Sequence, residues 1–477
     1  MANNKLQLVW LRSDLRSRDN PALYQASLKG PVICVWCSFE EQWLKHNDSP
    51  NKLRFWQENL NVLKKNLEVF NIPLITKRLK RFSDTADSLL QLAKKIDCEA
   101  IWFNDEYGAN EHKRDQNIKA VFDKAGIGCF SFTGDCLMTP GSVLNKEGSF
   151  FKVFTPFRKA VYQNISPSDY HPCPAPKKQE PPSLNVKSDK LPAYKPTAEN
   201  ILETWPAGEK NAHKILKAFI EERADGYKKN RDFPAKTGTS SLSVYLTAGV
   251  LSIRQCFEAA AKANDGELDT GCAGLACWMS ELIWREFYRH ILVGFPRVSM
   301  SRAFQKHTEQ IPWKTDKQLL KAWQEGKTGY PIVDAAMRQL VATGWMHNRL
   351  RMICAMFFTK DLMLDWRLGE KFFMEHLIDG DLASNNGGWQ WSASTGTDAA
   401  PYFRIFNPAS QSAKFDPDGV FLREWLPELK NLDGKSIHTP SSGKHDLLGS
   451  NPDYPEPIID HNLARTETLG TFKSLKK

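Results

Sequence analysis

A membrane-spanning run is missing from this sequence of 477 residues. No stretch approaches the roughly 18 uninterrupted apolar residues of a spanning helix, and the opening residues, MANNKLQLVW, lack the basic, apolar and small segments of a signal peptide. A composition of 41% hydrophobic and 25% charged residues is ordinary for a globular protein. We therefore expect a soluble, cytoplasmic chain with no membrane association, large enough to enclose a sizeable cofactor.

A disulfide framework and a metal motif are missing as well. The ten cysteines are scattered among apolar residues, as in proteins of a reducing compartment, where thiols pack as small hydrophobic groups. Cys34 and Cys37 have the spacing of a redox or zinc pair, but they lie in the apolar run PVICVWCSF, and no second pair completes a site. The eleven histidines form no HExxH motif. We expect buried thiols and no metal.

Glycine is missing where a dinucleotide-binding turn needs it. Up to about residue 135, amphipathic helices alternate with apolar strands, expected at 5–11, 31–39, 73–79, 100–107 and 127–134. The clearest helix begins after Ser49, with Pro50 in its first turn. This alternation predicts a parallel sheet covered by helices. The turn after the first strand, LRSDLRSRDNPAL, has no glycine, so a dinucleotide bound there in the usual way is not indicated.

Proline divides the chain into parts. Residues 165–200 hold eight of the 27 prolines, which favours an extended linker. Beyond this segment, strand patterns fade, helical segments follow one another, and ten of the fifteen tryptophans occur. We predict a chain of the α/β plus all-α class, with an α/β domain at 1–135, a linker at 136–199 and a helical domain at 200–477.

Positive charge is concentrated in one part of the chain. The whole chain has a net charge of +9, and between Arg285 and Lys360 thirteen Lys or Arg occur against five Asp or Glu. Solvated helix faces often carry such runs. Basic groups interleaved with indoles, here at positions 284, 313, 323 and 345, are more typical of a groove that binds phosphates and stacks bases. This pattern favours a nucleic-acid partner.

Three further segments place polar groups among apolar ones. GTSSLS, residues 238–243, puts four hydroxyls at a predicted helix start, which suits a diphosphate as well as an ordinary N-cap. Glu281 and Trp284 share a face of a predicted helix over 275–292, and Asn348, Arg351 and Met352 share a face of another over 346–364. Core packing explains the apolar residues but not the polar groups beside them.

The segment NNGGWQW, residues 385–391, carries two tryptophans behind paired glycines. Asp379 and Asp381 precede it. Large indoles beside glycines form a poor helix and an ordinary strand. Taken alone, the pair is most simply a packed aromatic corner.

Five segments resemble the flavin-binding domain of the photolyase and cryptochrome family: WREFYRH, TGYPIVDAAMRQL, TGWMHNRLRM, DGDLASNNGGWQW and TGTDAAPYFRIFNP. The amino-terminal VWLRSDLRSRDNPAL and the segment KVFTPF match too, so the resemblance covers essentially the whole chain. It is strongest to bacterial class I photolyases that act on cyclobutane pyrimidine dimers. The resemblance implies a monomeric carbon–carbon lyase for UV-damaged DNA, in which photoexcited reduced FAD lends an electron to a flipped-out dimer.

The resemblance implies a folded-back FAD in the helical domain. Arg351 and Asp379 would pair beside the flavin ring, with Asp381 near its edge and the ribose, and Asn385 would meet the flavin N5. The family carries asparagine at this position in repair enzymes and tends toward aspartate or cysteine in photoreceptors, so the resemblance favours a repair enzyme with an anionic reduced flavin. A neutral amide can bond N5 without adding a charge. The implied FAD-binding residues are Tyr227, Thr239, Ser240, Ser241, Leu242, Ser243, Trp278, Glu281, Arg285, Asn348, Arg351, Asp379, Asp381 and Asn385.

Tryptophan would have two separate roles. Trp284 and Trp391 would be walls against which the extruded dimer stacks, returning roughly 1–3 kcal/mol per base, and extruding a damaged pair costs less than extruding an intact one. Trp389, Trp366 and Trp313 would pass electrons between the surface and the flavin. The implied catalytic residues are Glu281, Trp284, Asn348, Met352, Asn385 and Trp391.

The lesion class follows from two of these positions. Glu281 and Asn348 would bind the pyrimidine edges, and Met352 would fill the pocket floor. Family members that repair (6-4) photoproducts carry histidine at the positions of Asn348 and Met352, because that reaction needs a proton donor. Dimer splitting needs only an electron that is lent and returned, so the resemblance implies specificity for dimers.

A second chromophore is also implied. Relatives often hold methenyltetrahydrofolate as an antenna, and His46, Asn110 and Glu111 match the residues expected to bind it. The folate tail usually meets a lysine where this chain has Met300, with Arg297 or Arg302 as substitutes. A surface histidine and carboxylate are the simpler interpretation of His46 and Glu111.

Two other functions fit the same residues. A blue-light sensor would use the same flavin and tryptophans, but such sensors commonly carry a long carboxyl tail, and only 69 residues follow Pro408. A carbohydrate-binding protein would also line a groove with tryptophan. Bound flavin would exclude that second alternative.

Overall fold

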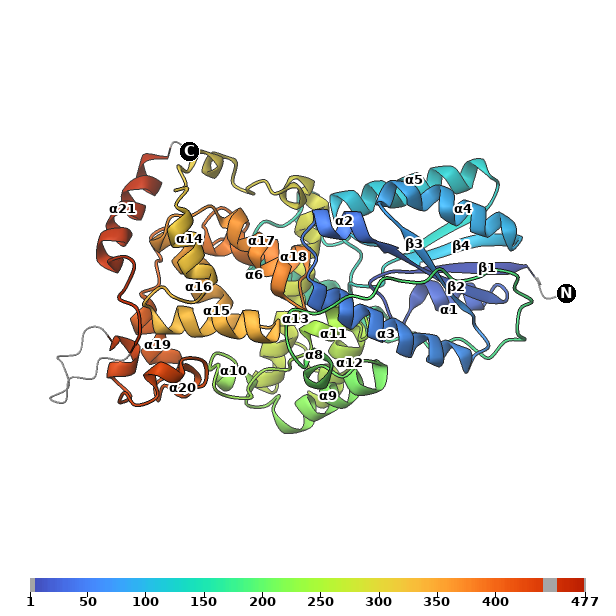
Figure 1. Cartoon of the computed structure of the whole chain (residues 1–477). Helices are drawn as coiled ribbons and strands as arrows, with labels where there is room; N and C mark the ends of the chain where they lie inside the picture. The colour runs from blue at the N-terminus through green and yellow to red at the C-terminus, as the bar shows by residue number, and fades with distance from the viewer. Residues whose placement is uncertain (1–4, 441–452, 476–477) are drawn as a thin grey trace. The chain divides into compact units, whose positions relative to one another are not determined.

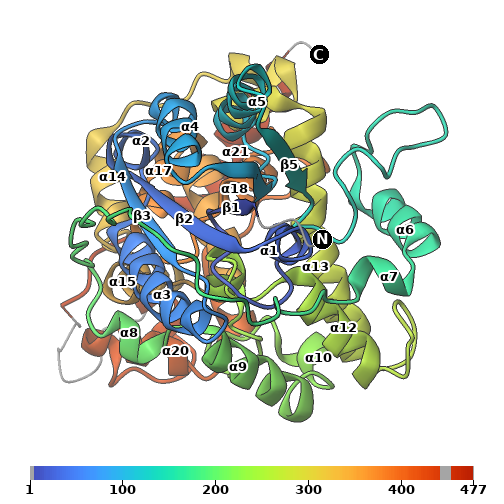
Figure 2. The ribbon, with the colours of Figure 1, turned by 90° about the vertical axis from the view of Figure 1, so that its right-hand side faces the viewer.

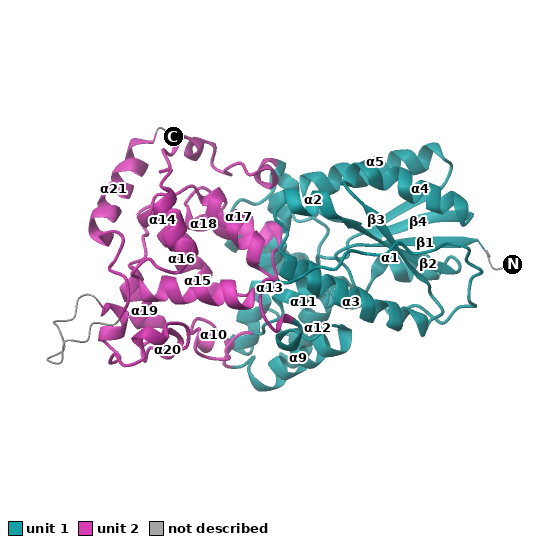
Figure 3. Ribbon diagram, viewed as in Figure 1, with its two compact units in different colours: residues 1–196, 202–225, 240–296 teal, residues 197–201, 226–239, 297–477 magenta. Residues whose placement is uncertain are grey.

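The computed structural model describes residues 5–440 and 453–475. The chain forms two compact units: unit 1 consists of residues 1–196, 202–225 and 240–296, and unit 2 of residues 197–201, 226–239 and 297–477 (Figure 1, Figure 3). The helices between 202 and 296 are thus mostly grouped with the α/β part, and the predicted domain limits stay a prediction. Within the described ranges, no helix has both the length and the apolar character needed to span a bilayer.

Unit 1 contains a parallel sheet of five strands in the order β3-β2-β1-β4-β5. The strands are β1 (Leu6–Leu11), β2 (Val32–Phe39), β3 (Leu74–Leu79), β4 (Cys98–Asn104) and β5 (Gly128–Phe132). All eight residues of β2 are buried, as expected for a parallel strand covered on both sides. Figure 2 shows α4 and α5 on one side of the sheet and α1 and α3 on the other. The predicted α/β fold is confirmed.

One helix of unit 1 begins where the sequence predicts it. Helix α3 starts at Pro50, and the Ser49 hydroxyl accepts a hydrogen bond from the Asn51 N–H at 3.1 Å. The helices of this unit are α1 (Pro21–Ser27), α2 (Glu40–Lys45), α3 (Pro50–Glu68), α4 (Thr85–Lys95), α5 (Ala109–Lys124), α6 (Phe154–Asn164), α7 (Pro167–Tyr170), α9 (Glu209–Glu222), α11 (Ser243–Thr247), α12 (Ile253–Ala263) and α13 (Ala273–Gly294), with a 3₁₀ turn η1 (Phe82–Asp84).

The proline-rich segment after α7 has no regular structure as far as residue 196, and it is hydrogen-bonded to the first residue of β2 and to the edge strand β3. The Gln179 side chain bonds both backbone groups of Val32, at 2.7 and 2.9 Å, and the Asp189 N–H donates to the Thr76 carbonyl at 2.9 Å. Because proline removes a backbone donor, this segment is fixed by its other residues.

Unit 2 is helical. Its core packs indoles against phenyl rings, and Trp323, Trp366 and Trp389 are each 2% exposed or less. The elements of this unit are α10 (Tyr227–Asn230), α14 (Lys317–Gln324), α15 (Pro331–Thr343), α16 (Asn348–Met356), α17 (Trp366–His376), α18 (Leu382–Ser392), α19 (Pro408–Phe415), α20 (Val420–Trp425) and α21 (His461–Ser474), with the short turns η3 (Lys306–Gln310), η4 (Phe357–Asp361), η5 (Pro427–Leu429) and η6 (Ser436–His438). Helix α8 (Ile201–Thr204) and turn η2 (Pro296–Met300) lie where the chain changes unit.

The segment NNGGWQW is helical, which corrects the expectation that its glycines and indoles disfavour a helix. It lies inside α18, whose N-cap Asp381 accepts a hydrogen bond from the Ser384 N–H at 2.9 Å. Burial of Trp389 in the core outweighs the propensity cost of the glycines, which is about 1 kcal/mol each. The predicted helix over 346–364 likewise ends earlier, at Met356, and continues as the π-helical turn η4.

All ten cysteines are free thiols. Burial raises the pKa of Cys34 and raises that of Cys37 to about 12, so both stay protonated and act as packing groups. Residues 5–440 and 453–475 contain no group of three or more His, Cys, Asp or Glu side chains arranged to hold a metal.

Candidate functional site

Helix α18 places its two tryptophans in different surroundings. Consecutive helical residues are turned by about 100°, so residues two apart lie on different sides. Trp389 is 2% exposed and packs edge-on against Trp323, Phe358 and Phe373, with ring centroids 6.0, 5.6 and 5.0 Å away. Trp391 is half-buried. One indole therefore belongs to the core, and the other keeps accessible surface.

The accessible side of α18 also carries Asn385 and Gly388, both half-buried. A Cβ built on Gly388 would meet no heavy atom of the described residues within 4 Å, apart from its chain neighbours and the backbone of its own helix. Glycine inside a helix costs roughly 0.5–1 kcal/mol relative to alanine, and no protein contact requires it here. This side of the helix therefore faces open space at Gly388.

Glu370 on α17 holds this part of α18 from behind. The Asn385 amide donates to the Glu370 backbone carbonyl at 3.0 Å, and the Asn386 amide donates to the Glu370 carboxyl at 2.9 Å. The Gln390 side-chain amide donates in turn to the side-chain Oδ1 of Asn386 at 2.9 Å. Burial raises the pKa of Glu370 to about 7. A carboxyl group that can carry a proton near neutral pH is therefore hydrogen-bonded to Asn386, the residue next to Asn385.

Sequence reasoning missed Glu370, although the sequence carries a signal for it. Glu370 occupies the apolar side of α17, four residues after Trp366 and three before Phe373, both of which are buried. A carboxyl group at such a position needs a polar partner. No spacing rule connects residue 370 with residue 385, so the partner itself could not be found.

Arg351 and Asp379 form an ion pair. The Arg351 Nη2 donates to both carboxylate oxygens of Asp379, at 3.0 and 2.8 Å, and its Nε donates to the Met346 carbonyl at 2.8 Å. Asp379 is 6% exposed. A nearly buried carboxylate is thus neutralised by a guanidinium whose plane is fixed by a second hydrogen bond.

Helix α16 presents Asn348, Arg351 and Met352 on one side. Asn348 is exposed and the other two are half-buried, while Leu350 and Ile353 are buried in the core. Helix α16 packs against α18. The predicted grouping of a polar and a soft side chain on one face is present, and their contacts with a lesion stay a prediction.

The three tryptophans assigned to electron transfer all lie in unit 2. Trp366 begins α17, is fully buried and lies under the Arg367 guanidinium at 4.7 Å. Gly369, one turn later, lies directly against the distal ring of Trp389. Trp313 is partly buried and packs against the cluster of Ile311, Met363 and Phe472. Two indoles are thus in the core and one reaches the surface.

Helix α13 in unit 1 carries four of the predicted residues. Glu281, Trp284 and Arg285 are half-buried on the same side. Trp278 is 2% exposed and packs on Phe219 at 4.8 Å, which is the environment of a core residue. Arg285 is paired with Asp135 through its Nη2 and donates from Nη1 to the Asp135 carbonyl at 2.9 Å. If Arg285 contacts the cofactor, its guanidinium must do so while it is also paired with Asp135.

The hydroxyl-rich segment runs from unit 2 into unit 1. Thr239, Ser240 and Ser241 are half-buried, Leu242 is buried and Ser243 is exposed at the first position of α11. Ser241 has a φ of 54°, a conformation that is uncommon for residues other than glycine and that recurs at ligand sites. Tyr227 begins α10 and lies under the Arg231 guanidinium at 5.4 Å.

The residues predicted for the antenna lie at two places in the chain. His46 follows α2, and its Nε2 is 3.2 Å from the Asn110 amide nitrogen on α5. Burial lowers the pKa of His46 and raises that of Glu111 to about 7. Met300 is 59% exposed and belongs to unit 2, where Arg297 pairs with Glu309 at 3.5 Å. Unit 1 thus brings His46 and Asn110 together, and folate binding stays a prediction.

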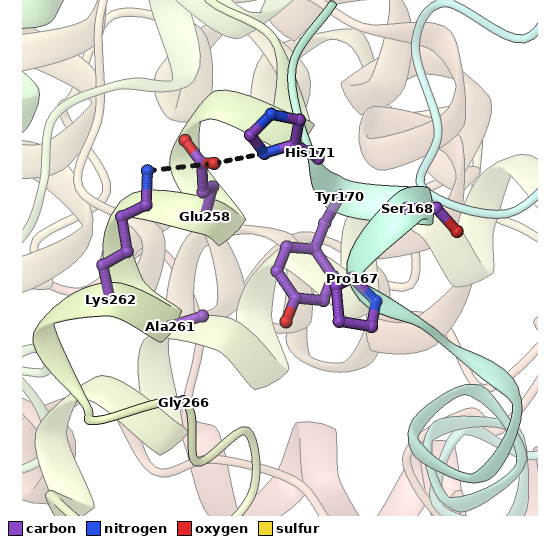
Figure 4. A pocket seen from close by; sticks show the side chains of 8 residues that line it. All are labelled: Pro167, Ser168, Tyr170, His171, Glu258, Ala261, Lys262 and Gly266. Atoms are coloured by element: carbon purple, nitrogen blue, oxygen red, sulfur yellow. Dashed lines mark hydrogen bonds and ion pairs between the residues drawn. The ribbon is translucent and has the colours of Figure 1, made fainter.

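A surface pocket of about 460 Å³ lies between α7 and α12 of unit 1. Its lining residues include Tyr170, His171, Glu258 and Lys262, and Glu258 bonds both His171 at 2.8 Å and Lys262 at 3.0 Å (Figure 4). Its lining contains none of the residues predicted for FAD, the lesion or the antenna. The pocket is therefore separate from the candidate site.

Comparisons with known proteins identify the family of this chain. Residues 7–177 match the family model for DNA photolyase, and residues 278–474 match that for the FAD binding domain of DNA photolyase. The deoxyribodipyrimidine photo-lyase of Vibrio cholerae is 44% identical, with 99% of this chain and 100% of that protein covered.

Two solved structures extend the likeness to the fold. A bacterial class III photolyase from Agrobacterium tumefaciens aligns with a TM-score of 0.91 at 34% identity, covering 100% of this chain and 98% of that one. A cryptochrome from Synechocystis sp. PCC6803 aligns with a TM-score of 0.87 at 28% identity, covering 99% and 100%. The fold, the FAD-binding domain and the full-length similarity together mean that this chain belongs to the DNA photolyase family.

Proposed function

We propose that this chain is a light-dependent lyase that splits cyclobutane pyrimidine dimers in UV-damaged DNA with FAD as its cofactor. The observation that carries the proposal is helix α18, which buries Trp389 on one side and leaves Asn385, Gly388 and Trp391 on the other. The similarity to curated deoxyribodipyrimidine photo-lyases over nearly the full length supports the choice of reaction.

The residues of the site fit an FAD. The open space at Gly388 leaves room for a group close to the helix, the Asn385 amide is oriented by Glu370, and the Arg351–Asp379 pair supplies a fixed cation and anion. Tyr227 and the hydroxyls of Thr239, Ser240, Ser241 and Ser243 suit the diphosphate and its surroundings, and Asp381 suits the ribose side. Bound flavin supplies absorption of blue light and the electron for repair.

The chain itself contributes binding and order. Trp284 and Trp391 stack on the extruded bases, Glu281 and Asn348 bond their edges, and Met352 fills the floor. Two carbon–carbon bonds of the cyclobutane ring break while one electron is accepted and then given back, so the reaction has no net redox change and needs no proton donor. This suits the amide and thioether at positions 348 and 352. Electrons from an external donor reach the cofactor through Trp313, Trp366 and Trp389.

The DNA contact is proposed for the basic part of the chain between Arg285 and Lys360. Several of its cations already have partners, such as Arg338 with Glu428 at 2.7 Å and Arg349 with Asp232 at 2.9 Å. The number of phosphates contacted is therefore smaller than the thirteen basic residues of this part. The salt dependence of DNA binding measures this number. A plot of the logarithm of the binding constant against the logarithm of the salt concentration becomes steeper by about 0.9 for each neutralised phosphate.

The direct test is illumination of the reduced, FAD-loaded protein with an oligonucleotide that contains one thymine dimer. We expect blue light to restore two adjacent thymines, as seen by the return of ultraviolet absorbance of the bases and by chromatography, with no repair in the dark. Intact dimers after prolonged illumination of a protein that binds FAD would contradict the proposal.

A blue-light sensor is the second candidate, favoured by the alignment with the Synechocystis cryptochrome. A sensor would bind FAD and undergo photoreduction without splitting dimers, so the same experiment separates the two. The folate antenna, a monomeric state and a cytoplasmic location stay predictions. An absorption spectrum of the purified protein tests the antenna, because methenyltetrahydrofolate adds a near-ultraviolet band to that of the flavin.

A further inference from the structure

Phe154 and Trp284 of unit 1 form a parallel ring stack. Their centroids are 3.7 Å apart and their planes differ by 12°. Phe154 is 5% exposed, whereas Trp284 is half-buried. The other rings around this indole meet it at larger angles: Phe287 at 5.7 Å and 80°, and Tyr288 at 5.7 Å and 35°. Phe154 therefore covers one face of the Trp284 indole with a nearly parallel ring, and a base that stacks on this indole would do so on the opposite face.

Residues other than Phe154 also anchor helix α6 on α13. Phe157, one turn later, is 1% exposed and packs against Phe287 and His290 of α13 at 5.2 and 4.9 Å. Arg158 Nη1 donates to the Ser280 hydroxyl of α13 at 3.2 Å. Helix α6 thus keeps anchors on α13 when the Phe154 ring is removed.

We infer that Phe154 is a positioning residue for recognition of the dimer, because it holds the plane of Trp284 ready for stacking. The inference rests on the proposed function, in which Trp284 is one wall of the lesion site. An aromatic wall that is fixed before binding loses less conformational entropy when the substrate arrives. An aromatic ring pair of this kind changes a binding constant, here the Kd for the dimer, by about 2- to 10-fold.

The test compares Phe154→Leu with Phe157→Leu in the full-length, FAD-loaded protein. Both substitutions remove a buried ring between α6 and α13, but only the first removes the ring stacked on Trp284. Fluorescence anisotropy in the dark measures the Kd for a labelled oligonucleotide with one thymine dimer and for the same undamaged sequence. We expect Phe154→Leu to reduce the preference for the dimer by about 2- to 10-fold and Phe157→Leu to leave it unchanged. Phe154→Tyr, which keeps the ring, should restore the preference.

A second readout separates positioning from folding. Under continuous light, Phe154→Leu should raise KM for dimer-containing DNA and leave the repair rate at saturating DNA unchanged, with normal FAD content and photoreduction. Equal loss of preference in the two leucine variants, or no loss in Phe154→Leu, would overturn the inference. Trp284→Ala tests the proposed function separately: if this variant keeps full preference for the dimer, the assignment of the wall itself is wrong.

Discussion

The two sides of α18 differ in how much of their surroundings the protein itself supplies. The side of Trp389 is filled by rings of the core, and not even a methyl group fits at Gly369 beside it. The side of Asn385, Gly388 and Trp391 has a polar group oriented from behind and open space in front. The filled side stabilises the fold, and under the proposed function it also carries electron transfer, whereas the open side is proposed to bind the ligands. Each side should then fail in its own way when it is altered.

The largest loss of stability is expected for Gly369→Ala on the filled side. The added methyl group would overlap the distal ring of Trp389, and overpacking of this severity costs about 3 kcal/mol. We expect a lower free energy of unfolding in urea and slow photoreduction of bound FAD, because the indole must move.

The matched control is the double variant Gly369→Ala/Trp389→Phe. The smaller ring leaves room for the methyl group, so stability should recover while photoreduction stays slow for lack of the indole. Wild-type stability of the single variant would show that the Trp389 ring has free space, contrary to its close contact with Gly369.

We expect Glu370→Gln to change how the free energy of unfolding depends on pH, by up to about 3 kcal/mol. Burial raises the pKa of Glu370 from 4.5 to about 7, while Asn386 and Arg367 lower it and Asp365 raises it. The folded state therefore binds more protons than the unfolded state between these values, and the free energy of unfolding falls as pH rises from about 4.5 to about 7. Urea unfolding at several pH values should show a smaller fall in the Gln variant.

Glu375→Gln is the control for Glu370. Glu375 lies on the same helix, is 40% exposed and pairs with Lys371 at 3.7 Å. Solvent screens such a pair, so this substitution should leave the pH dependence unchanged. If Glu370→Gln shows the wild-type pH dependence as well, Glu370 does not hold an extra proton in the folded protein.

Trp391→Ala on the open side should change binding and leave the fold intact. Loss of one stacking surface costs about 1–3 kcal/mol per base, so the Kd for a dimer-containing oligonucleotide should rise about 5- to 150-fold. Photoreduction and the free energy of unfolding should stay near the wild-type values, because Trp389 and its neighbours are untouched. Trp391→Phe should lose less affinity, and equal affinity in all three proteins would remove Trp391 from the lesion site.

The periodic parts of the molecule could be predicted from sequence, and the contacts between distant segments could not. The strands and α3 follow from apolar patterns and from the signal of Ser49 and Pro50. Local propensity wrongly disfavours the helix α18, because it says nothing about the rings that surround Trp389. The bonds from Glu370 to residues 385 and 386, and the stack of Phe154 on Trp284, join segments 15 to 130 residues apart. Sequence spacing has no rule for such distances.

The smallest effect, Gly388→Ala, tests whether the open side is reserved for a ligand. Alanine favours a helix over glycine by about 0.5–1 kcal/mol, and its methyl group would meet no described atom beyond the local helix. The apoprotein should therefore become slightly more stable in urea, while the Kd for FAD or for dimer-containing DNA rises, because the methyl group fills the space that the ligand uses. Gly470→Ala on α21 is the control, since a Cβ there also meets nothing, and it should stabilise the protein without changing either Kd. If Gly388→Ala behaves in the same way as this control, the space beside α18 is merely unfilled surface, and the contrast between the two sides of the helix has no functional meaning.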